Sequence, residues 1–390
     1  MLIHSIKLDR FLSFGESSEA TPLGNLNVVI GANGSGKSNL LEAFDLLHNA
    51  PRDLQKPIRE GGGVQEWLWK GYQGERDPIA NVMVVASNLP DRPALRYNLR
   101  FLKNTFGGFG LVGELIDDAD SAQGSEPRRV YFNYMVIKAD LRVGGEIRSL
   151  QSPDYDPSQS ILAQRRDPEQ YPEITRLAQN FEAIRLYRDW SFGRRSAARR
   201  PQDAALPNQY LESDGSNLGL ILNRFQREPA VKARLLTALR KLYEGIDDYG
   251  VQIEGGTVQV FVQEGDRTIP AARLSDGTLR YLCLLAILCH PKPPPLVCIE
   301  EPELGLHPDI LPTVAELLKD ASERCQLIVT THSDVLVDAM TDRPETVLVV
   351  EKDDNGTVLR RLDAESLKPW LEKYRLGELW TRGDIGGTRW

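Results

Sequence analysis

The sequence is poor in cysteine and has no long apolar stretch. Its four cysteines lie in apolar segments without the close paired spacing of a zinc site: they are Cys283, Cys289, Cys298 and Cys325. We therefore expect reduced thiols in the core, with no metal or redox role. No run approaches the roughly 18 apolar residues that a membrane helix needs, and the first residues lack the apolar region of a signal peptide. These absences predict a cytoplasmic protein without a membrane segment.

An excess of positive charge is also missing, because 47 lysines and arginines stand against 55 aspartates and glutamates. The net charge of −8 argues against a protein that coats nucleic acid, since such binding depends on neutralising phosphates. One local basic cluster stands out, and it consists of Arg188, Arg194, Arg195, Arg199 and Arg200. Three interpretations stay open for it: a solvated loop, a contact with nucleic acid such as DNA, or a contact with nucleotide phosphates in trans.

The 390 residues suffice for one large or two closely joined domains. Strand patterns in residues 1–50 lead into a glycine-rich loop and a helix, and residues 270–390 return to alternating strands and helices. We expect these two stretches to form one α/β doubly wound core. Residues 51–205 read as an inserted antiparallel sheet with loops, and residues 206–269 read as a helical lobe followed by a hairpin. No heptad pattern is sustained, which excludes a long coiled coil.

The glycine-rich loop fits the P-loop pattern of nucleotide-binding proteins. It runs GANGSGKS from Gly31 to Ser38, between a buried strand and an amphipathic helix. Small residues there let backbone N–H groups surround phosphates at a helix N-terminus. Lys37 is expected to reach the β and γ phosphates of ATP, and Ser38 to bind Mg²⁺. The predicted nucleotide contacts are Gly31, Asn33, Gly34, Ser35, Gly36, Lys37, Ser38 and Asn39.

Two adjacent carboxylates end the apolar strand Leu296–Glu301. Parallel sheets bind ligands at the carboxyl ends of their strands, so this position suits chemistry. After a P-loop, the pattern indicates a Walker B motif. Glu300 would support the hydrated Mg²⁺, and Glu301 would orient the attacking water or accept its proton.

Two further motifs flank this strand. Leu274–Thr278 precedes a buried helix, where Ser275 and Gly277 can present a hydroxyl and bare amides to an anion. Ser275 would cap that helix in any case. Beyond the strand, His332 ends the next predicted strand, QLIVTTH, and is placed to sense the γ-phosphate.

In this order, the motifs resemble those of the ABC ATPases and, within them, the RecF and SMC-like group often labelled AAA-type. IKLDRFLSFGE with LNVVIGANGSGKSNLLEAF, and IEEPELGLHPDILP with LIVTTHSDVLVDAM, are similar to the two halves of such heads. The resemblance covers residues 1–50 and about 270–340. It implies an α/β P-loop NTPase of ABC-ATPase head type, with a mixed central sheet, an antiparallel β subdomain and a helical signature lobe. Neither a coiled coil nor a Toprim domain is expected.

The resemblance also implies a mechanism. Two heads sandwich two ATP molecules, so that Ser275 and Gly277 of one copy touch the γ-phosphate held by Lys37 of the other. Hydrolysis then reopens the homodimer, which makes a timed switch. The implied catalytic residues of this Mg-dependent ATPase are Glu301, His332 and Lys37.

The sequence departs from the family pattern in several places. Asp276 and Thr278 stand where transporter signatures usually carry Gly and Gln, and the acidic group predicts slow turnover. Walker B carries Glu300 where Asp is usual. The glutamine of the Q-loop stays open between Gln151 and Gln164, and the adenine-stacking aromatic between Phe11 and Phe14.

Three functions compete. RecF and SMC relatives suggest an ATPase switch in DNA repair, genome maintenance or phage defence. An energy-coupling subunit of a membrane transporter is an alternative, although the signature is unlike LSGGQ. The third is an ATPase that regulates a separate effector or nuclease chain: TVLVVEKDDNG is superficially similar to the start of a Toprim domain, with Glu351, but no later DxD pair follows.

Overall fold

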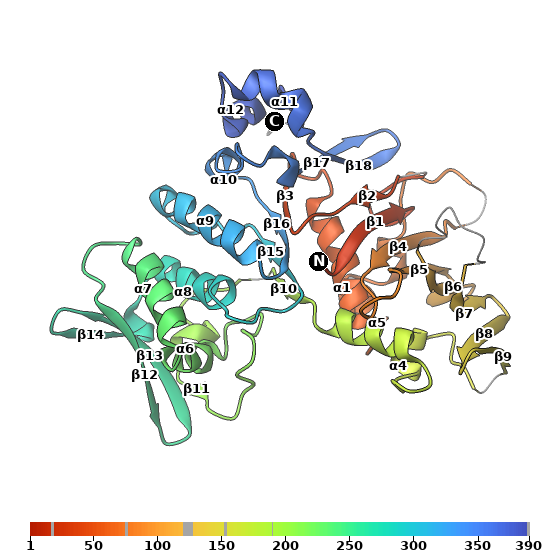
Figure 1. Ribbon diagram of the computed structural model, residues 1–390, viewed down its shortest axis with the longest axis horizontal. Helices are drawn as coiled ribbons and strands as arrows, with labels where there is room; N and C mark the ends of the chain where they lie inside the picture. Colours follow the sequence, from red (N-terminus) through yellow and green to blue (C-terminus); the bar gives the residue numbers. More distant parts are fainter. Residues whose placement is uncertain (17–18, 75–76, 120–127, 152–153, 189, 388–390) are drawn as a thin grey trace. The chain divides into compact units, whose positions relative to one another are not determined.

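The computed structural model describes residues 1–16, 19–74, 77–119, 128–151, 154–188 and 190–387. The chain forms two compact units, each assembled from separate stretches (Figure 1). Unit 1 comprises Met1–Ile184, Glu345–Asp363 and Arg382–Trp390, and unit 2 comprises Arg185–Pro344 and Ala364–Thr381. The domain boundaries expected from the sequence follow the positions of the motifs, whereas the two units follow the packing of the chain. The expected boundaries stay a prediction.

Unit 1 contains an eight-stranded sheet in which every neighbouring pair is antiparallel. Buried and part-exposed residues alternate along two of its central strands, Ala80–Ala86 and Leu95–Lys103, as in a sheet with one face packed on the core. Gly144 and Gly145 form the tight turn of its last hairpin at φ 56° and 97°, as their sequence predicts. In sheet order the strands are β2 (Thr21–Pro22), β1 (Ile3–Asp9), β4 (Ala80–Ala86), β5 (Leu95–Lys103), β6 (Phe109–Asp118), β7 (Val130–Met135), β8 (Lys138–Val143) and β9 (Glu146–Leu150).

The predicted strand, loop and helix of the P-loop also lie in unit 1. The wholly buried strand β3 (Leu26–Ile30) pairs in parallel with β17 (Val347–Asp353), which pairs antiparallel with β18 (Gly356–Arg361). Helix α1 (Lys37–Asn49) follows the loop, and its apolar face packs on α2 (Lys56–Glu60) and α5 (Pro172–Glu182). Two one-turn helices complete the unit, α3 (Val64–Trp67) and α4 (Ile161–Gln164).

Helix α5 lies in a region that the sequence analysis assigned to strands and loops. It begins with Pro172 and carries Glu173 in its first turn, both favourable at a helix N-terminus. Its buried residues Ile174, Leu177, Ala178 and Phe181 recur at the spacing of one helix face. The signal was therefore present over three turns, within a long stretch dominated by strand patterns.

Unit 2 holds the strands that end in the Walker B and histidine motifs. β10 (Arg185–Tyr187), β15 (Leu296–Glu300) and β16 (Gln326–Thr330) pair in parallel, with Glu300 opposite Thr330. The alternating helices are α8 (Asp276–Leu288), α9 (Leu311–Ser322) and α10 (Asp334–Asp338). Helix α8 is buried along nearly its whole length, which agrees with its apolar sequence on all sides.

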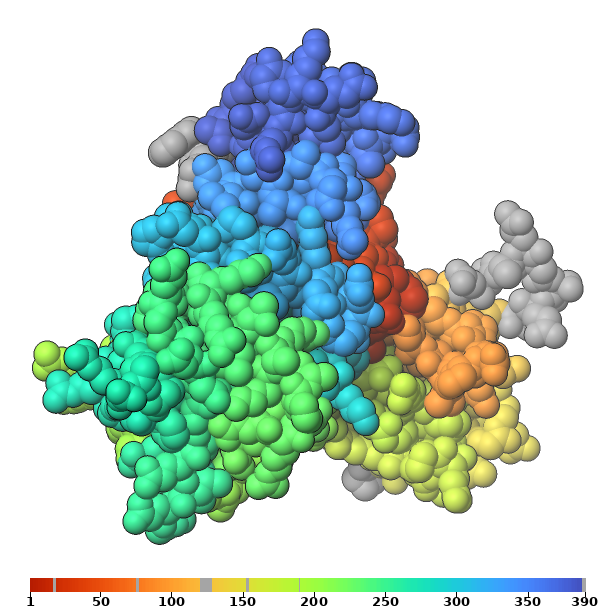
Figure 2. Space-filling model, turned by 60° about the vertical axis from the view of Figure 1, so that its left-hand side comes forward, coloured from red at the N-terminus to blue at the C-terminus, as the bar shows by residue number. Residues whose placement is uncertain are grey.

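The predicted helical lobe and hairpin are present in unit 2. Helices α6 (Leu218–Gln226) and α7 (Pro229–Arg240) pack on α8, and the hairpin joins β12 (Asp248–Glu254) to β13 (Thr257–Glu264). Strands β11 (Gln202–Asp203) and β14 (Arg267–Pro270) pair with β13. These elements are coloured green to teal in Figure 2, where they form one continuous surface.

Two short helices lie near the C-terminal end, α11 (Ala364–Leu371) and α12 (Leu376–Thr381), and α12 packs on α10. Within the described part of the chain, every helix is too short or too polar to span a bilayer. The longest have 13 residues.

Candidate functional site

The glycine-rich loop of unit 1 depends on glycine at two points of close approach. A side chain on Gly31 would place its Cβ 2.4 Å from the carbonyl oxygen of Val350 in the neighbouring strand. Gly36 has φ 112°, and a Cβ there would lie 2.6 Å from the hydroxyls of both Ser13 and Thr357. The sequence pattern therefore reflects steric limits set by β17, β18 and the segment around Ser13.

The polar groups of this loop fit an anion. Lys37 is buried, and its Nζ donates to the carbonyl oxygens of Gly31 (2.8 Å) and Ala32 (2.9 Å). The hydroxyl of Ser35 is buried, and no other described residue forms a hydrogen bond with it. An orphaned buried donor beside a buried ammonium group is costly unless a ligand satisfies it. Ser38, in contrast, is exposed at the start of α1.

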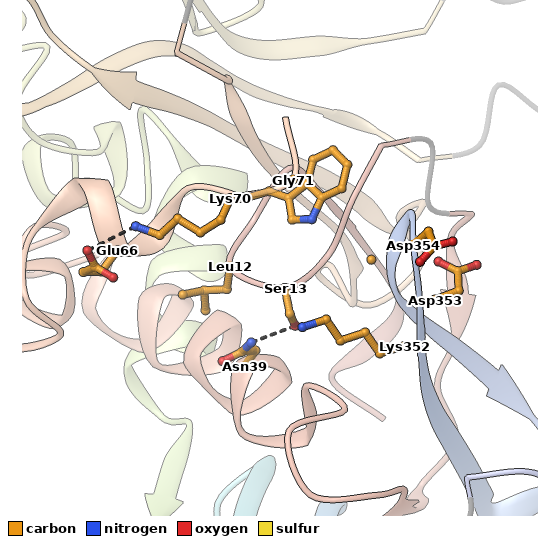
Figure 3. A pocket seen from close by; sticks show the side chains of 11 residues that line it. Leu12, Ser13, Asn39, Glu66, Lys70, Gly71, Lys352, Asp353 and Asp354 are labelled. Atoms are coloured by element: carbon orange, nitrogen blue, oxygen red, sulfur yellow. Dashed lines mark hydrogen bonds and ion pairs between the residues drawn. The ribbon is translucent and has the colours of Figure 1, made fainter. Parts of the chain in front are cut away.

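A pocket of about 540 Å³ adjoins the loop within unit 1 (Figure 3). Asn39 links the two, because its side-chain amide donates to Ser13 Oγ at 2.7 Å. Thr357 Oγ1 lies 2.7 Å from Ser13 Oγ and from the carbonyl oxygen of Ser35. The lining combines the aromatic ring of Trp69 with charged groups, and it includes Leu12, Ser13, Asn39, Glu66, Lys70, Lys352, Asp353 and Asp354.

Phe11 and Phe14, the two aromatics considered for stacking on adenine, are placed differently. Their side chains are 0% and 1% exposed. Phe11 packs edge-on against Trp67 and Phe101. Neither ring presents a face to a ligand, and Trp69 is the aromatic residue that lines the pocket.

The two glutamines considered for the Q-loop both lie in unit 1. The side-chain amide of Gln164 donates to the carbonyl oxygens of Asp156 and Gln159, so it holds the loop that precedes it in the chain. Gln151 is exposed after the last strand of the antiparallel sheet. The Q-loop assignment therefore stays open.

In unit 2, Glu300 and Arg188 form an ion pair. Arg188 Nε lies 3.2 Å from Glu300 Oε2, and each side chain is 20% exposed. The two residues come from adjacent parallel strands or their ends, β10 and β15. One arginine of the basic cluster, Arg188, therefore pairs with the carboxylate that ends the Walker B strand.

Glu301 has an unusual backbone conformation, with φ 45°. Its N–H donates to the carbonyl oxygen of Thr330 at 3.1 Å, and its own carbonyl oxygen accepts from Arg280 Nη2 at 2.8 Å. Glu301 Oε1 lies 3.5 Å from His332 Nε2. A left-handed non-glycine residue is strained and marks a site where the surroundings impose the geometry.

Glu303 is a residue of this cluster to which the sequence analysis gave no role of its own. Its Oε1 accepts from the hydroxyl of Thr331 and from the backbone N–H of His332, both at 2.7 Å. Its Oε2 is buried and has no hydrogen-bond partner in the described ranges. Burial raises the pKa of this carboxyl group. The sequence signal was only its place in the PELGLHP run.

The signature segment starts helix α8. Ser275 Oγ accepts from the N–H of Thr278 at 3.0 Å, which is the expected N-cap. Gly277 packs tightly, because a Cβ there would lie 2.7 Å from the carbonyl oxygen of Gly305. Ser275 and Asp276 are exposed, and the carboxylate of Asp276 pairs with Arg199.

The structure thus gathers the predicted residues into two groups. Unit 1 holds the loop residues Gly31, Asn33, Gly34, Ser35, Gly36, Lys37, Ser38 and Asn39, and unit 2 holds Ser275, Gly277, Glu300, Glu301 and His332. No cluster of three or more histidine, cysteine or acidic side chains poised for a metal occurs among the described residues. Hydroxyl and carboxylate oxygens, as on Ser38 and Glu300, are nevertheless the donors that Mg²⁺ prefers.

Solved structures of SMC head domains share this fold. An SMC head bound to the C-winged helix domain of ScpA matches with a TM-score of 0.59 at 17% identity, covering 94% of this chain and 99% of that chain. An SMC head domain with an extended coiled coil, bound to the C-terminal domain of ScpA and derived from Pyrococcus furiosus, matches with a TM-score of 0.57 at 15% identity, covering 95% and 99%. Fold, motifs and the family match given next together define an ABC-type, SMC-like P-loop ATPase.

The chain belongs to the family described as "AAA domain, putative AbiEii toxin, Type IV TA system", whose model matches residues 26–338. The Old nuclease of Escherichia phage P2 is 31% identical over 128 residues, which are 30% of this chain. The match spans 22% of the length of that relative.

Proposed function

We propose that the chain binds ATP with Mg²⁺ in unit 1, hydrolyses it with residues of unit 2, and uses ATP binding to join two copies. The observation that carries the proposal is the polar imbalance of the glycine-rich loop. Ser35 Oγ is buried without a partner among the described residues, and the buried ammonium group of Lys37 lies at the backbone carbonyl oxygens of Gly31 and Ala32 in the same loop. A phosphate oxygen would satisfy the Ser35 hydroxyl and carry the negative charge that suits the Lys37 ammonium group, and Asn33 and Gly34 are exposed in the same loop.

The adjoining pocket suits the rest of the nucleotide. Its volume lies in the usual range for small-molecule sites. Trp69 supplies an aromatic face for a base, and Ser13 and Asn39 supply polar groups next to the loop. Trp69→Ala should therefore weaken binding of ATP more than binding of inorganic triphosphate; equal losses in competition titrations would remove Trp69 from the site.

Hydrolysis is assigned to the cluster in unit 2. Glu301 would orient the attacking water and take its proton, and His332, 3.5 Å away, would respond to the γ-phosphate. Ser38 and Glu300 each carry an oxygen of the kind that Mg²⁺ prefers, and the ion would supply charge neutralisation on the phosphates. Arg188 pairs with Glu300, so the carboxylate is held in one orientation.

Dimerisation rests on the signature. Ser275 is exposed at the N-terminus of the 13-residue helix α8, where a hydroxyl and the helix dipole favour an anion. A γ-phosphate carried by a second copy would meet this end, so ATP would connect two chains and hydrolysis would release them.

The test compares oligomeric state with and without ATP. Glu301→Gln should bind ATP, lose hydrolysis by on the order of 10²-fold or more, and accumulate as a dimer, because the amide cannot accept the proton. Light scattering in saturating Mg-ATP reads the mass. The matched control is the double variant Glu301→Gln/Lys37→Ala, which should stay monomeric. A Glu301→Gln protein that binds ATP yet remains monomeric would contradict the sandwich.

The process is proposed to be DNA repair, genome maintenance or phage defence. The match to a phage nuclease favours, as a second candidate, an ATPase that regulates a separate effector or nuclease chain. ATP hydrolysis measured with and without linear and single-stranded DNA at low salt separates the two. Stimulation that added salt abolishes would support a DNA-activated switch. Indifference to DNA would instead point to a protein trigger.

A further inference from the structure

Arg199 of the basic cluster is committed to the signature segment. It ends the short 3₁₀ helix η1 (Ala197–Arg199), which packs on η2 (Ala271–Arg273) just before the signature. Its Nη2 pairs with Asp276 Oδ1, and its Nη1 donates to the carbonyl oxygen of Leu274 at 2.6 Å. Its Nε donates to the carbonyl oxygen of Phe192 at 3.2 Å. All three nitrogens of the guanidinium are thus engaged.

The burial of the pair is uneven. The side chain of Arg199 is 12% exposed, whereas that of Asp276 is 61% exposed. An arginine is seldom withdrawn from water unless its charge and donors are matched, and here one carboxylate and several carbonyl groups match them. The carboxylate remains at the surface, and the neighbouring residue Ser275 is exposed as well.

Asp276 poses an electrostatic problem for the proposed function. A carboxylate in the first turn suits the helix dipole, but it repels a phosphate that approaches the same N-terminus. This repulsion is why the sequence predicts slow turnover. The guanidinium of Arg199 neutralises that charge through its ion pair with the carboxylate.

We propose that Arg199 is a positioning residue that neutralises Asp276, so that Ser275 and Gly277 can accept the γ-phosphate of a second copy. The inference rests on the proposed function of the signature. Three interpretations of the basic cluster were open. For Arg199 the inference favours the one in which the cluster takes part in a phosphate contact in trans, and Arg199 acts there through Asp276. Arg194, Arg195 and Arg200 are exposed on the same segment and need no part in it.

The experiment is a double-mutant cycle on ATP hydrolysis as a function of protein concentration. Arg199→Ala should leave ATP binding by the monomer intact and raise the concentration for half-maximal activity about tenfold, because unneutralised Asp276 opposes dimerisation. Arg199→Ala/Asp276→Asn should return to within about threefold of the wild type, since the repelling charge is gone.

This recovery separates charge from structure. If Arg199 acted only by holding the carbonyl groups of residues 271–274, removing the Asp276 charge would not restore activity, and the inference would be overturned. Arg199→Lys retains the charge and should lose less than threefold; a loss equal to that of Arg199→Ala would also overturn it. Thermal unfolding of each variant checks that the fold persists.

Ser275→Leu distinguishes this inference from the proposed function itself. If Ser275→Leu leaves dimerisation unchanged, the signature does not contact the nucleotide and the proposed function fails with the inference. If Ser275→Leu abolishes dimerisation while Arg199→Ala does nothing, only the role of Arg199 fails.

Discussion

The phosphate loop of unit 1 and the carboxylates of unit 2 differ in how their polar groups are partnered. In the loop, Ser35 Oγ is buried without a described partner, and the ammonium group of Lys37 donates to the carbonyl oxygens of Gly31 and Ala32. In unit 2, Glu300 pairs with Arg188 and Asp276 with Arg199. The loop thus holds a buried hydroxyl that a ligand could satisfy, whereas Glu300 and Asp276 each already have an arginine of the protein beside them. We infer that binding energy comes mainly from unit 1, and that unit 2 contributes geometry.

The largest effect on turnover should come from removing the lysine side chain of the phosphate loop. Lys37→Ala removes a buried ammonium group that two phosphates would share, so ATP affinity should fall about 100-fold or more. Titration with a fluorescent ATP analogue measures it. Lys138→Ala, an exposed lysine of the same unit, is the control. Equal affinities of the Lys37→Ala variant and the wild type would refute the assignment.

A smaller effect should follow from loosening the cluster of unit 2. Glu303→Ala removes the acceptor for Thr331 Oγ1 and the N–H of His332, so kcat should fall about tenfold with ATP affinity unchanged. Glu303→Gln keeps a carbonyl acceptor and should lose less.

Glu316→Ala, an exposed carboxylate on α9, controls for charge. A Glu303→Ala variant that weakens ATP binding instead of kcat would show that the cluster supplies binding energy, against the comparison drawn above.

The smallest effect on turnover is expected at Glu114, outside both sites. This buried carboxylate accepts from Tyr97 OH and from the N–H of Ile161, and burial raises its pKa to about 7. The folded protein therefore holds a proton that the unfolded chain releases above about pH 4.5.

The contribution of Glu114 to stability is full below pH 4.5 and is lost as pH rises towards 7, by on the order of 3 kcal/mol. Glu114→Gln should remove this dependence. Urea unfolding between pH 4.5 and 7.5 measures it, and parallel curves for the two proteins would contradict it.

The parts of the fold and of the candidate site that the sequence predicts are those that depend on local residue patterns. The strand, loop and helix around Gly31 to Asn49, the hairpin at Gly144 and Gly145, and the cap at Ser275 each depend on a few neighbouring residues. The types and spacing of these residues therefore predict the three features. In the same way, the alternation of strand and helix patterns predicts the α/β core.

Other features depend on residues far apart in the chain. Arg188 meets Glu300 across 112 positions and Arg199 meets Asp276 across 77, so nothing in either segment alone predicts the pairs. The burial of Phe11 and Phe14 likewise follows from packing on Trp67 and Phe101. The left-handed backbone of Glu301 is imposed by partners such as Arg280, and a glutamate gives no local hint of it.

The four buried cysteines have a practical consequence for measuring motion. Burial raises the pKa of Cys283 to about 12 and that of Cys325 to about 11, and it raises the pKa of Cys289 as well. Maleimides react with accessible thiolates, so these native thiols should label slowly while the protein is folded. A single cysteine introduced at an exposed position should then carry a dye selectively without a cysteine-free background. Energy transfer between two such dyes would follow the joining and parting of copies in real time.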